Sequence, residues 1–290
     1  MKHIHLHIFL LFISVSVFGQ NAATSFEVAG IKVILKPTIK EVIDVNMYYR
    51  GGVANYPAEK AGLENLSLAA ATECGTKKYS GNAFRDRAES YGIDLGGSSN
   101  YDYGIISMTC ISRFFDQGWD LFAEAVSNPV FDQRELGMLK DKIVSGVKQS
   151  ESDPDDRIEQ LTLQNAFAGT PYAINPGGEE STLNKLSAQE VKDYYYNTLL
   201  NKKRMFIVIV GKITKEQVIK KIQASFANLP VKTYKPVVLS VPAATGKLLS
   251  EQRQLATNYI TGSFNAPQVN SPDFLPFRLA ISNLSNKLFR

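Results

Sequence analysis

Residues 61–76 read A-G-L-E-N-L-S-L-A-A-A-T-E-C-G-T, and this stretch predicts the first long helix and its end. Leu63, Leu66 and Ala70 recur at positions i, i+3 and i+7, which places them on one buried stripe of an α-helix. Gly75 stands where a left-handed residue is needed to end the helix. The stretch therefore predicts an amphipathic helix that packs on another element.

A strand and a glycine pair precede this helix. Residues 43–49 are rich in β-branched and aromatic side chains, which favour strands. Gly51 and Gly52 follow closely, and a loop with Pro57 leads into the helix. The local unit is therefore a strand, a glycine turn, a loop and a helix that packs on a sheet.

The rest of the chain does not alternate strands and helices one for one, and hairpins precede runs of helices. This order favours an α+β fold, with helices packed on one face of a mostly antiparallel sheet. Capping-box patterns, in which a Ser, Thr or Asp precedes a Glu or Gln by three residues, predict three helix starts. They are Asp132 with Glu135, Ser187 with Glu190, and Thr214 with Gln217. We expect strands at 25–29, 31–35, 41–50, 93–100, 103–112 and 205–210, and helices at 61–73, 80–91, 115–127, 132–150 and 154–167.

The stretch at 61–79 resembles the pitrilysin/insulinase family of zinc peptidases. The residues that carry the resemblance are Gly62, Leu63, Leu66, Gly75, Thr76, Lys77 and Tyr79. In active members this helix carries the inverted motif H-x-x-E-H, whose histidines bind zinc together with a distant Glu, while the motif Glu is the general base. The resemblance implies a pitrilysin/insulinase-like domain.

The three motif places fall on or near Asn65, Leu68 and Ala69, and none of these residues can bind zinc as His does or act as a base. The stretch has one residue more than the usual active pattern, so the register is fixed to one place. Shifting it does not help, because residues 61–76 contain no histidine.

The family's third ligand is a Glu on the long helix before a D-P-[DE] break. Counting back from the break at 153–155 puts this place at Ser145 or Gly146. All ligand and base positions are therefore substituted. The resemblance implies a member that has no catalytic residues, no metal ligands and no cofactor.

The composition supports the same interpretation. The three histidines of the 290-residue chain, His3, His5 and His7, all lie in a predicted signal peptide, so the mature chain has none. That excludes His-based zinc sites and Ser-His-Asp triads. The net charge of +4, without a basic run interleaved with aromatic residues, predicts no nucleic-acid partner.

Residues 1–19 are predicted to be a removable secretory signal. The apolar run at 8–18 is too short to span a bilayer, and Val17 and Gly19 suit the −3 and −1 places of a cleavage site. The mature chain would begin near Gln20, with no membrane span, in the periplasm or outside the cell. Cys74 and Cys110, the only cysteines, either pair or stay buried as free thiols.

A proline-bounded segment after the first domain predicts a linker. Beyond it, a predicted strand at 258–262, a loop and a helix from Phe274 repeat the order of the first unit. We therefore expect a signal peptide at 1–19, a pitrilysin/insulinase-like domain at 20–229, a linker at 230–246 and an incomplete second such domain at 247–290. The basic cluster at 202–204 is expected to be a solvated strand entry.

The resemblance implies an exported, catalytically inactive protein. It would be a partner subunit, or a peptide-binding wall, for an active zinc peptidase subunit of the same family, and unfolded peptides are possible ligands. Two alternatives stay open: a peptidase with an unrecognised active site, and a free-standing peptide-binding or structural module. The absence of histidine from the mature chain weighs against the peptidase.

Overall fold

The computed structural model describes residues 22–238, 240–243 and 246–288. The predicted signal peptide at 1–19 lies outside these residues.

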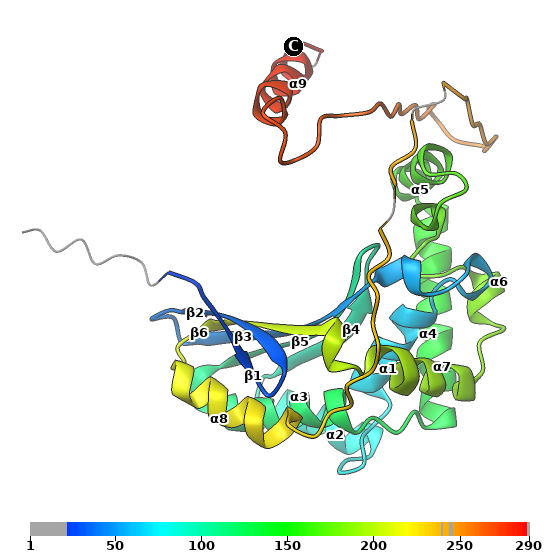
Figure 1. Cartoon of the computed structure of the whole chain (residues 1–290). Coiled ribbons are helices and arrows are strands. Elements are labelled where there is room, and N and C mark those ends of the chain that lie inside the picture. Colours follow the sequence, from blue (N-terminus) through cyan, green and yellow to red (C-terminus); the bar gives the residue numbers. More distant parts are fainter. Residues whose placement is uncertain (1–21, 239, 244–245, 289–290) are drawn as a thin grey trace, which may run out of the picture.

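Six strands form one sheet, in the order β1-β2-β6-β3-β5-β4 (Figure 1). All neighbouring strands are antiparallel except β2 and β6, which are parallel. This confirms the predicted, mostly antiparallel sheet. The strands are β1 (Thr24–Val28), β2 (Ile31–Pro37), β3 (Val42–Arg50), β4 (Asp94–Ser99), β5 (Tyr103–Ile111) and β6 (Met205–Gly211).

Helices cover one face of this sheet, as the α+β prediction requires. Figure 1 shows α1, α3 and α8 on the same side of the strands, and α1 packs against β4 while α3 packs against β5. The helices are α1 (Leu63–Glu73), α2 (Gly81–Ser90), α3 (Phe115–Ser127), α4 (Gln133–Ser152), α5 (Pro154–Ala166), α6 (Glu180–Leu183), α7 (Ala188–Tyr194), α8 (Lys215–Phe226) and α9 (Phe274–Leu288).

Strand β3 shows how the sequence selects this face. Ile43, Val45, Met47 and Tyr49 are at most 1% exposed, while the residues between them are only partly buried. Successive side chains of a strand point to opposite faces, so every second residue enters the core beneath the helices.

Two of the three predicted capping boxes form completely, at Ser187 with Glu190 and at Thr214 with Gln217. The third forms only in part. Asp132 accepts hydrogen bonds from the first backbone N–H groups of α4, but the Glu135 carboxylate binds the Arg85 guanidinium at 2.9 Å instead of turning back to Asp132. A charge-assisted hydrogen bond between helices has replaced the local one.

Two of the three residues of the basic cluster at 202–204 are buried, contrary to the sequence prediction, and only Lys203 is exposed. Lys202 and Arg204 are each only 7% exposed. The Lys202 ammonium donates to the carbonyl of Ala227 at 2.6 Å, and the Arg204 guanidinium donates to the carbonyl of Arg50. The acceptors come from distant parts of the chain, so the local sequence gave no sign of them.

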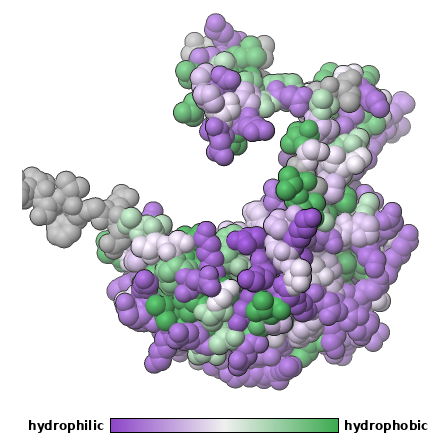
Figure 2. Space-filling model, in the orientation of Figure 1, coloured by the Kyte–Doolittle hydropathy of each residue, from purple (hydrophilic) through white to green (hydrophobic). Residues whose placement is uncertain are grey.

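The predicted strand at 258–262 is absent from the structure: these residues form no regular secondary structure and are exposed, with no strand beside them among the described residues. Helix α9 does begin at Phe274. It stands apart from the main body, and Figure 2 shows apolar residues on its surface. Three of its apolar residues are more than half exposed, namely Leu275, Leu279 and Leu284.

The segment before α9 touches the main body at the end of α4 and on α5. The Arg157 guanidinium pairs with Glu251 at 2.5 Å, and Arg253 donates to the carbonyl of Glu151 at 2.7 Å. Elsewhere, Cys74 and Cys110 are both buried as free thiols. None of the helices in the described part of the chain has the length and apolar character that a membrane crossing needs.

Candidate functional site

Helix α1 is fixed at both ends by glycines with positive φ. Gly62 precedes the helix with φ 86°, and a Cβ there would lie 2.8 Å from the Cα of Gly178. Gly75 follows it with φ 88°, as the sequence predicts. The close approach of two backbones and the left-handed exit hold the helix in one position.

The sides of α1 are packed as closely as its ends. Leu66, Leu68 and Ala70 are fully buried. On the β4 side, a Cβ at Gly97 would lie 2.0 Å from the carbonyl oxygen of Leu68, so only glycine permits the contact. The helix that carries the resemblance is therefore an integral part of the core.

The three motif places have other roles in this fold. Asn65 is half-buried, and its Oδ1 accepts a hydrogen bond from the backbone N–H of Ser99 at 3.1 Å. Leu68 is fully buried and Ala69 is 7% exposed, and both are hydrocarbon side chains of the core. One place therefore binds the end of strand β4, and the other two contribute apolar packing.

The place of the third zinc ligand is likewise occupied by residues whose side chains do not suit zinc coordination. Ser145 and Gly146 are exposed on α4, and the Ser145 hydroxyl donates to the carbonyl of Asp141 at 2.8 Å. Zinc takes nitrogen, thiolate or carboxylate ligands, usually four in tetrahedral geometry. The residues present at these places do not fit the metal. The described residues also contain no group of three or more His, Cys, Asp or Glu side chains that could hold one.

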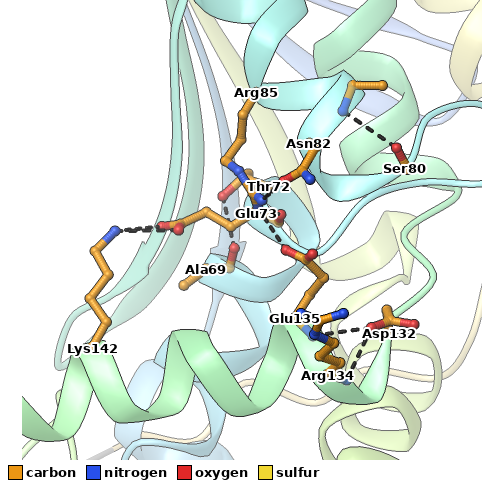
Figure 3. Close-up of polar contacts among 11 residues, drawn as sticks. Ala69, Thr72, Glu73, Ser80, Asn82, Arg85, Asp132, Arg134, Glu135 and Lys142 are labelled. Carbon is orange, nitrogen blue, oxygen red and sulfur yellow. Dashed lines mark hydrogen bonds and ion pairs between the residues drawn. The ribbon is translucent and has the colours of Figure 1, made fainter.

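Ion pairs occupy the end of α1 next to these places (Figure 3). The Arg85 guanidinium on α2 donates to the carbonyl of Glu73 at 2.7 Å and to Glu135 on α4 at 2.9 Å. Lys142 on α4 pairs with the Glu73 carboxylate at 3.3 Å. These charges compensate one another and join α1 to α2 and α4, so this cluster holds the scaffold together.

Glu64 is the polar residue of α1 that the sequence prediction missed. Its side chain is fully buried, and its Oε2 accepts hydrogen bonds from Asn55 at 2.8 Å and from the Tyr194 hydroxyl at 2.6 Å. Its Oε1 has no partner among the described residues. Burial raises the pKa of this carboxyl to about 7. A Glu in the first turn of a helix is usually solvated and suits the helix dipole, so its burial could not be inferred locally.

Three consecutive tyrosines bind three different elements. Tyr194 reaches Glu64 on α1, Tyr195 donates to the carbonyl of Val126 on α3 at 2.8 Å, and Tyr196 donates to the carbonyl of Pro129 at 2.6 Å. Tyr195 and Tyr196 lie in a single π-turn, Tyr195–Leu199. Because successive hydroxyls all point inward, this turn is a junction of the fold.

Strand β4 is the terminal strand of the sheet, and part of its outer edge is open. The backbone N–H of Asn100 donates to the carbonyl of Tyr103 across the hairpin, so Asn100 points toward β5. In an antiparallel pair, the backbone groups of every second residue point to the partner strand. Those of Leu95, Gly97 and Ser99 therefore point away from β5, to the outer edge. Asn65 occupies the Ser99 N–H. The outward groups of Leu95 and Gly97 face no further strand in the described part of the chain, and such an edge can pair with an extended peptide.

Two family models match the chain in succession. The model described as Insulinase (Peptidase family M16) matches residues 34–176, which include the strand–glycine–helix unit. The model described as Peptidase M16 inactive domain matches residues 185–290.

Individual relatives agree with this assignment. A Helicobacter pylori protein named Non-peptidase homolog YmxG is 26% identical over 188 residues, which are 64% of this chain and 43% of that protein. Cytochrome b-c1 complex subunit 1 of Bos taurus is 22% identical over 200 residues, 69% of this chain and 41% of that protein. The chain thus spans less than half the length of these two curated relatives.

A solved structure shows the same fold. The periplasmic protease PqqL from Escherichia coli superimposes with a TM-score of 0.69 at 18% identity, over 76% of this chain and 25% of that one. Together with the substituted motif on α1, the two matching family models show that this chain belongs to the insulinase family, peptidase family M16, as a degenerate and non-catalytic member.

Proposed function

We propose that this chain is an exported subunit that holds peptide beside an active zinc peptidase of the same family. The observation that carries the proposal is the state of α1: the motif helix is intact and fully packed, but Asn65, Leu68 and Ala69 stand in its three motif places. A motif helix that is retained without its zinc-binding side chains favours a role in binding and assembly over one in hydrolysis.

The open edge of β4 supports the peptide-binding part of the proposal. Leu95 and Gly97 present backbone groups that an unfolded peptide in extended conformation can pair with. Backbone pairing of this kind tolerates many sequences, because the hydrogen bonds come from the main chain and not from particular side chains. It suits a wall that presents varied peptides to a neighbouring active site.

Two observations support the partner. The bovine relative is by its name a subunit of a complex, the cytochrome b-c1 complex. In addition, helix α9 exposes Leu275, Leu279 and Leu284, and such apolar surface is stabilised when another body covers it. We propose the boundaries 20–229 for the first domain, 230–246 for the linker and 247–290 for the start of a second domain.

Export is proposed from the predicted signal at residues 1–19, and the neighbour PqqL is named a periplasmic protease. The test is N-terminal sequencing of the protein from the cell envelope or the medium. A mature form that begins near Gln20 supports export. An intact chain that retains Met1 in the cytoplasm contradicts it.

The partner is tested by purifying the tagged mature chain from its source cell and identifying what remains bound by mass spectrometry. We expect a chain of the same family with an intact H-x-x-E-H motif, and peptidase activity that is higher for the pair than for that chain alone. A chain that binds unfolded peptide without any such partner would instead be a free-standing module. Peptide cleavage by the pure chain in the presence of a chelator would favour an unrecognised active site.

A further inference from the structure

The first residues after α8 are held on the main body, although the sequence predicts that the linker begins there. The backbone N–H of Lys202 donates to the carbonyl of Pro230 at 3.0 Å. Two residues later, the backbone N–H of Lys232 donates to the Oδ1 of Asn201 at 3.0 Å. We call residues 230–234 the strap.

The side chain of Lys232 makes two hydrogen bonds to the main body. Its ammonium donates to the carbonyls of Tyr196 at 2.6 Å and Asn197 at 3.2 Å, in the π-turn Tyr195–Leu199. The last carbonyls of a helical segment have no donor within the helix, and a lysine can satisfy them while its charge suits the negative end of the dipole. Lys232 therefore caps a turn that lies more than thirty residues earlier in the chain.

The end of the strap rests on the sheet. The ring of Tyr234 lies 4.8 Å from the guanidinium carbon of Arg204, at the distance of a cation–π contact. Arg204 is buried and donates from Nε and Nη2 to the carbonyl of Arg50, the last residue of β3, at 3.1 and 2.6 Å. The position of Tyr234 is therefore fixed by a side chain that is itself immobilised.

The contacts end after Tyr234. Residues 235–238 are exposed and make no hydrogen bond or ion pair with any described residue. Among the described residues, the next hydrogen bond between this segment and the main body runs from Asn165 on α5 to the carbonyl of Lys247 at 3.0 Å. The segment between these two attachments contains Pro236 and Pro242, which favour extended backbone.

We propose that Lys232 anchors the start of the linker, so that movement between the first domain and the tail pivots directly after Tyr234, within residues 235–238. The strap then belongs to the first domain, and that domain ends five residues after Leu229, where the sequence places its boundary. The anchor shares its π-turn with Tyr196 and adjoins Tyr194, which holds Glu64 on α1. Movement of the tail is therefore restrained at the π-turn Tyr195–Leu199, and the neighbouring Tyr194 contacts the motif helix.

The pivot is tested in the full mature chain with pairs of spin labels and pulsed dipolar spectroscopy. One label is placed on α8 with Lys220→Cys, and the second is placed either within the strap with Thr233→Cys or beyond it with Val237→Cys, all at exposed positions. Cys74 and Cys110 are buried and are not expected to react. We expect a narrow distance distribution for the pair with residue 233 and one at least twofold broader for the pair with residue 237.

Lys232→Met keeps the length of the side chain but removes its donors, and it should broaden the 233 distribution to the width of the 237 distribution. Lys235→Met, three residues away and exposed, is the matched control and should change neither. A label pair at positions 192 and 220 reports whether each variant is folded. Equal widths for 233 and 237 in the wild type, or no effect of Lys232→Met in a folded variant, would overturn the proposal; if that variant does not fold, the wild-type comparison decides.

Discussion

The Oδ1 of Asn65 lies 3.1 Å from the backbone nitrogen of Ser99, and this hydrogen bond joins the motif helix to the edge strand of the sheet. In active members of the family, the corresponding place on the helix is expected to hold a zinc ligand. Here the Oδ1 of Asn65 faces β4 and accepts the hydrogen bond of the last outward-pointing N–H of that strand, that of Ser99. The substituted position thus has a structural role, and it also limits how far along β4 a peptide can pair.

Asn65→Ala should destabilise the fold by about 1–2 kcal/mol, because it leaves the partly buried N–H of Ser99 without an acceptor. Asn65→Asp retains an oxygen in the same place and is the matched control, with a smaller expected loss. Urea unfolding of both variants measures the difference. Equal free energies of unfolding for Asn65→Ala and the wild type would show that the hydrogen bond contributes nothing to stability.

The purified mature chain should carry no stoichiometric zinc, since Asn65, Leu68, Ala69 and the Ser145–Gly146 pair offer no ligand set that suits the metal. Incubation with zinc, gel filtration and elemental analysis measure the content. In a parallel experiment, neither added zinc nor a chelator should shift the unfolding temperature. One tightly held zinc ion per chain, with a lower unfolding temperature after chelation, is the result that contradicts this prediction.

Stability should fall with rising pH because of Glu64. Burial raises the pKa of this carboxyl to about 7 from 4.5, so between these values the folded state binds the proton more tightly than the unfolded state. The stability that this proton contributes is fully present below about pH 4.5 and is lost as pH rises through 7. The total change is on the order of 3 kcal/mol.

Glu64→Gln tests this prediction, because an amide cannot ionise. Its free energy of unfolding should vary less between pH 5 and pH 8 than that of the wild type, and the variant should be the more stable of the two at pH 8. Glu59→Gln, at an exposed position in the preceding turn, is the control and should follow the wild type. A Glu64→Gln profile parallel to the wild-type profile would show that Glu64 is not the group responsible.

Local sequence signals predicted the elements whose causes are local. The alternation in β3, the i, i+3, i+7 stripe of α1 and the complete boxes at Ser187 and Thr214 all depend on residues within a few positions of one another. The sequence also shows that the motif places are substituted, because the residue types at Asn65, Leu68 and Ala69 can be read from it directly.

Distant partners explain what was missed. Glu64 is buried because Tyr194 and Asn55 meet it, and Arg204 is buried because it finds a carbonyl at Arg50. The strand expected at 258–262 would need a neighbouring strand to complete its hydrogen bonds, and the described residues provide none. No periodicity within a short window carries information about such partners.

The tail should not be needed for the first domain to fold. Helix α9 and the residues before it bury little apolar surface. Their polar contacts with α4 and α5 include the ion pair of Arg157 with Glu251 and the hydrogen bond from Arg253 to the carbonyl of Glu151. A partly exposed ion pair or a surface hydrogen bond of this kind contributes about 1 kcal/mol. A chain that ends after Tyr234 should therefore unfold cooperatively at nearly the wild-type temperature and resist limited proteolysis.

A chain that ends after Leu229 lacks the strap, so the carbonyls of Tyr196 and Asn197 lose the Lys232 ammonium. This shorter chain should still fold, but its unfolding temperature should be several degrees lower. Thermal unfolding of the two truncated chains beside the full one decides the boundary. If neither truncated chain folds, the tail is part of the first domain's core and the proposed division at residues 229–235 is wrong.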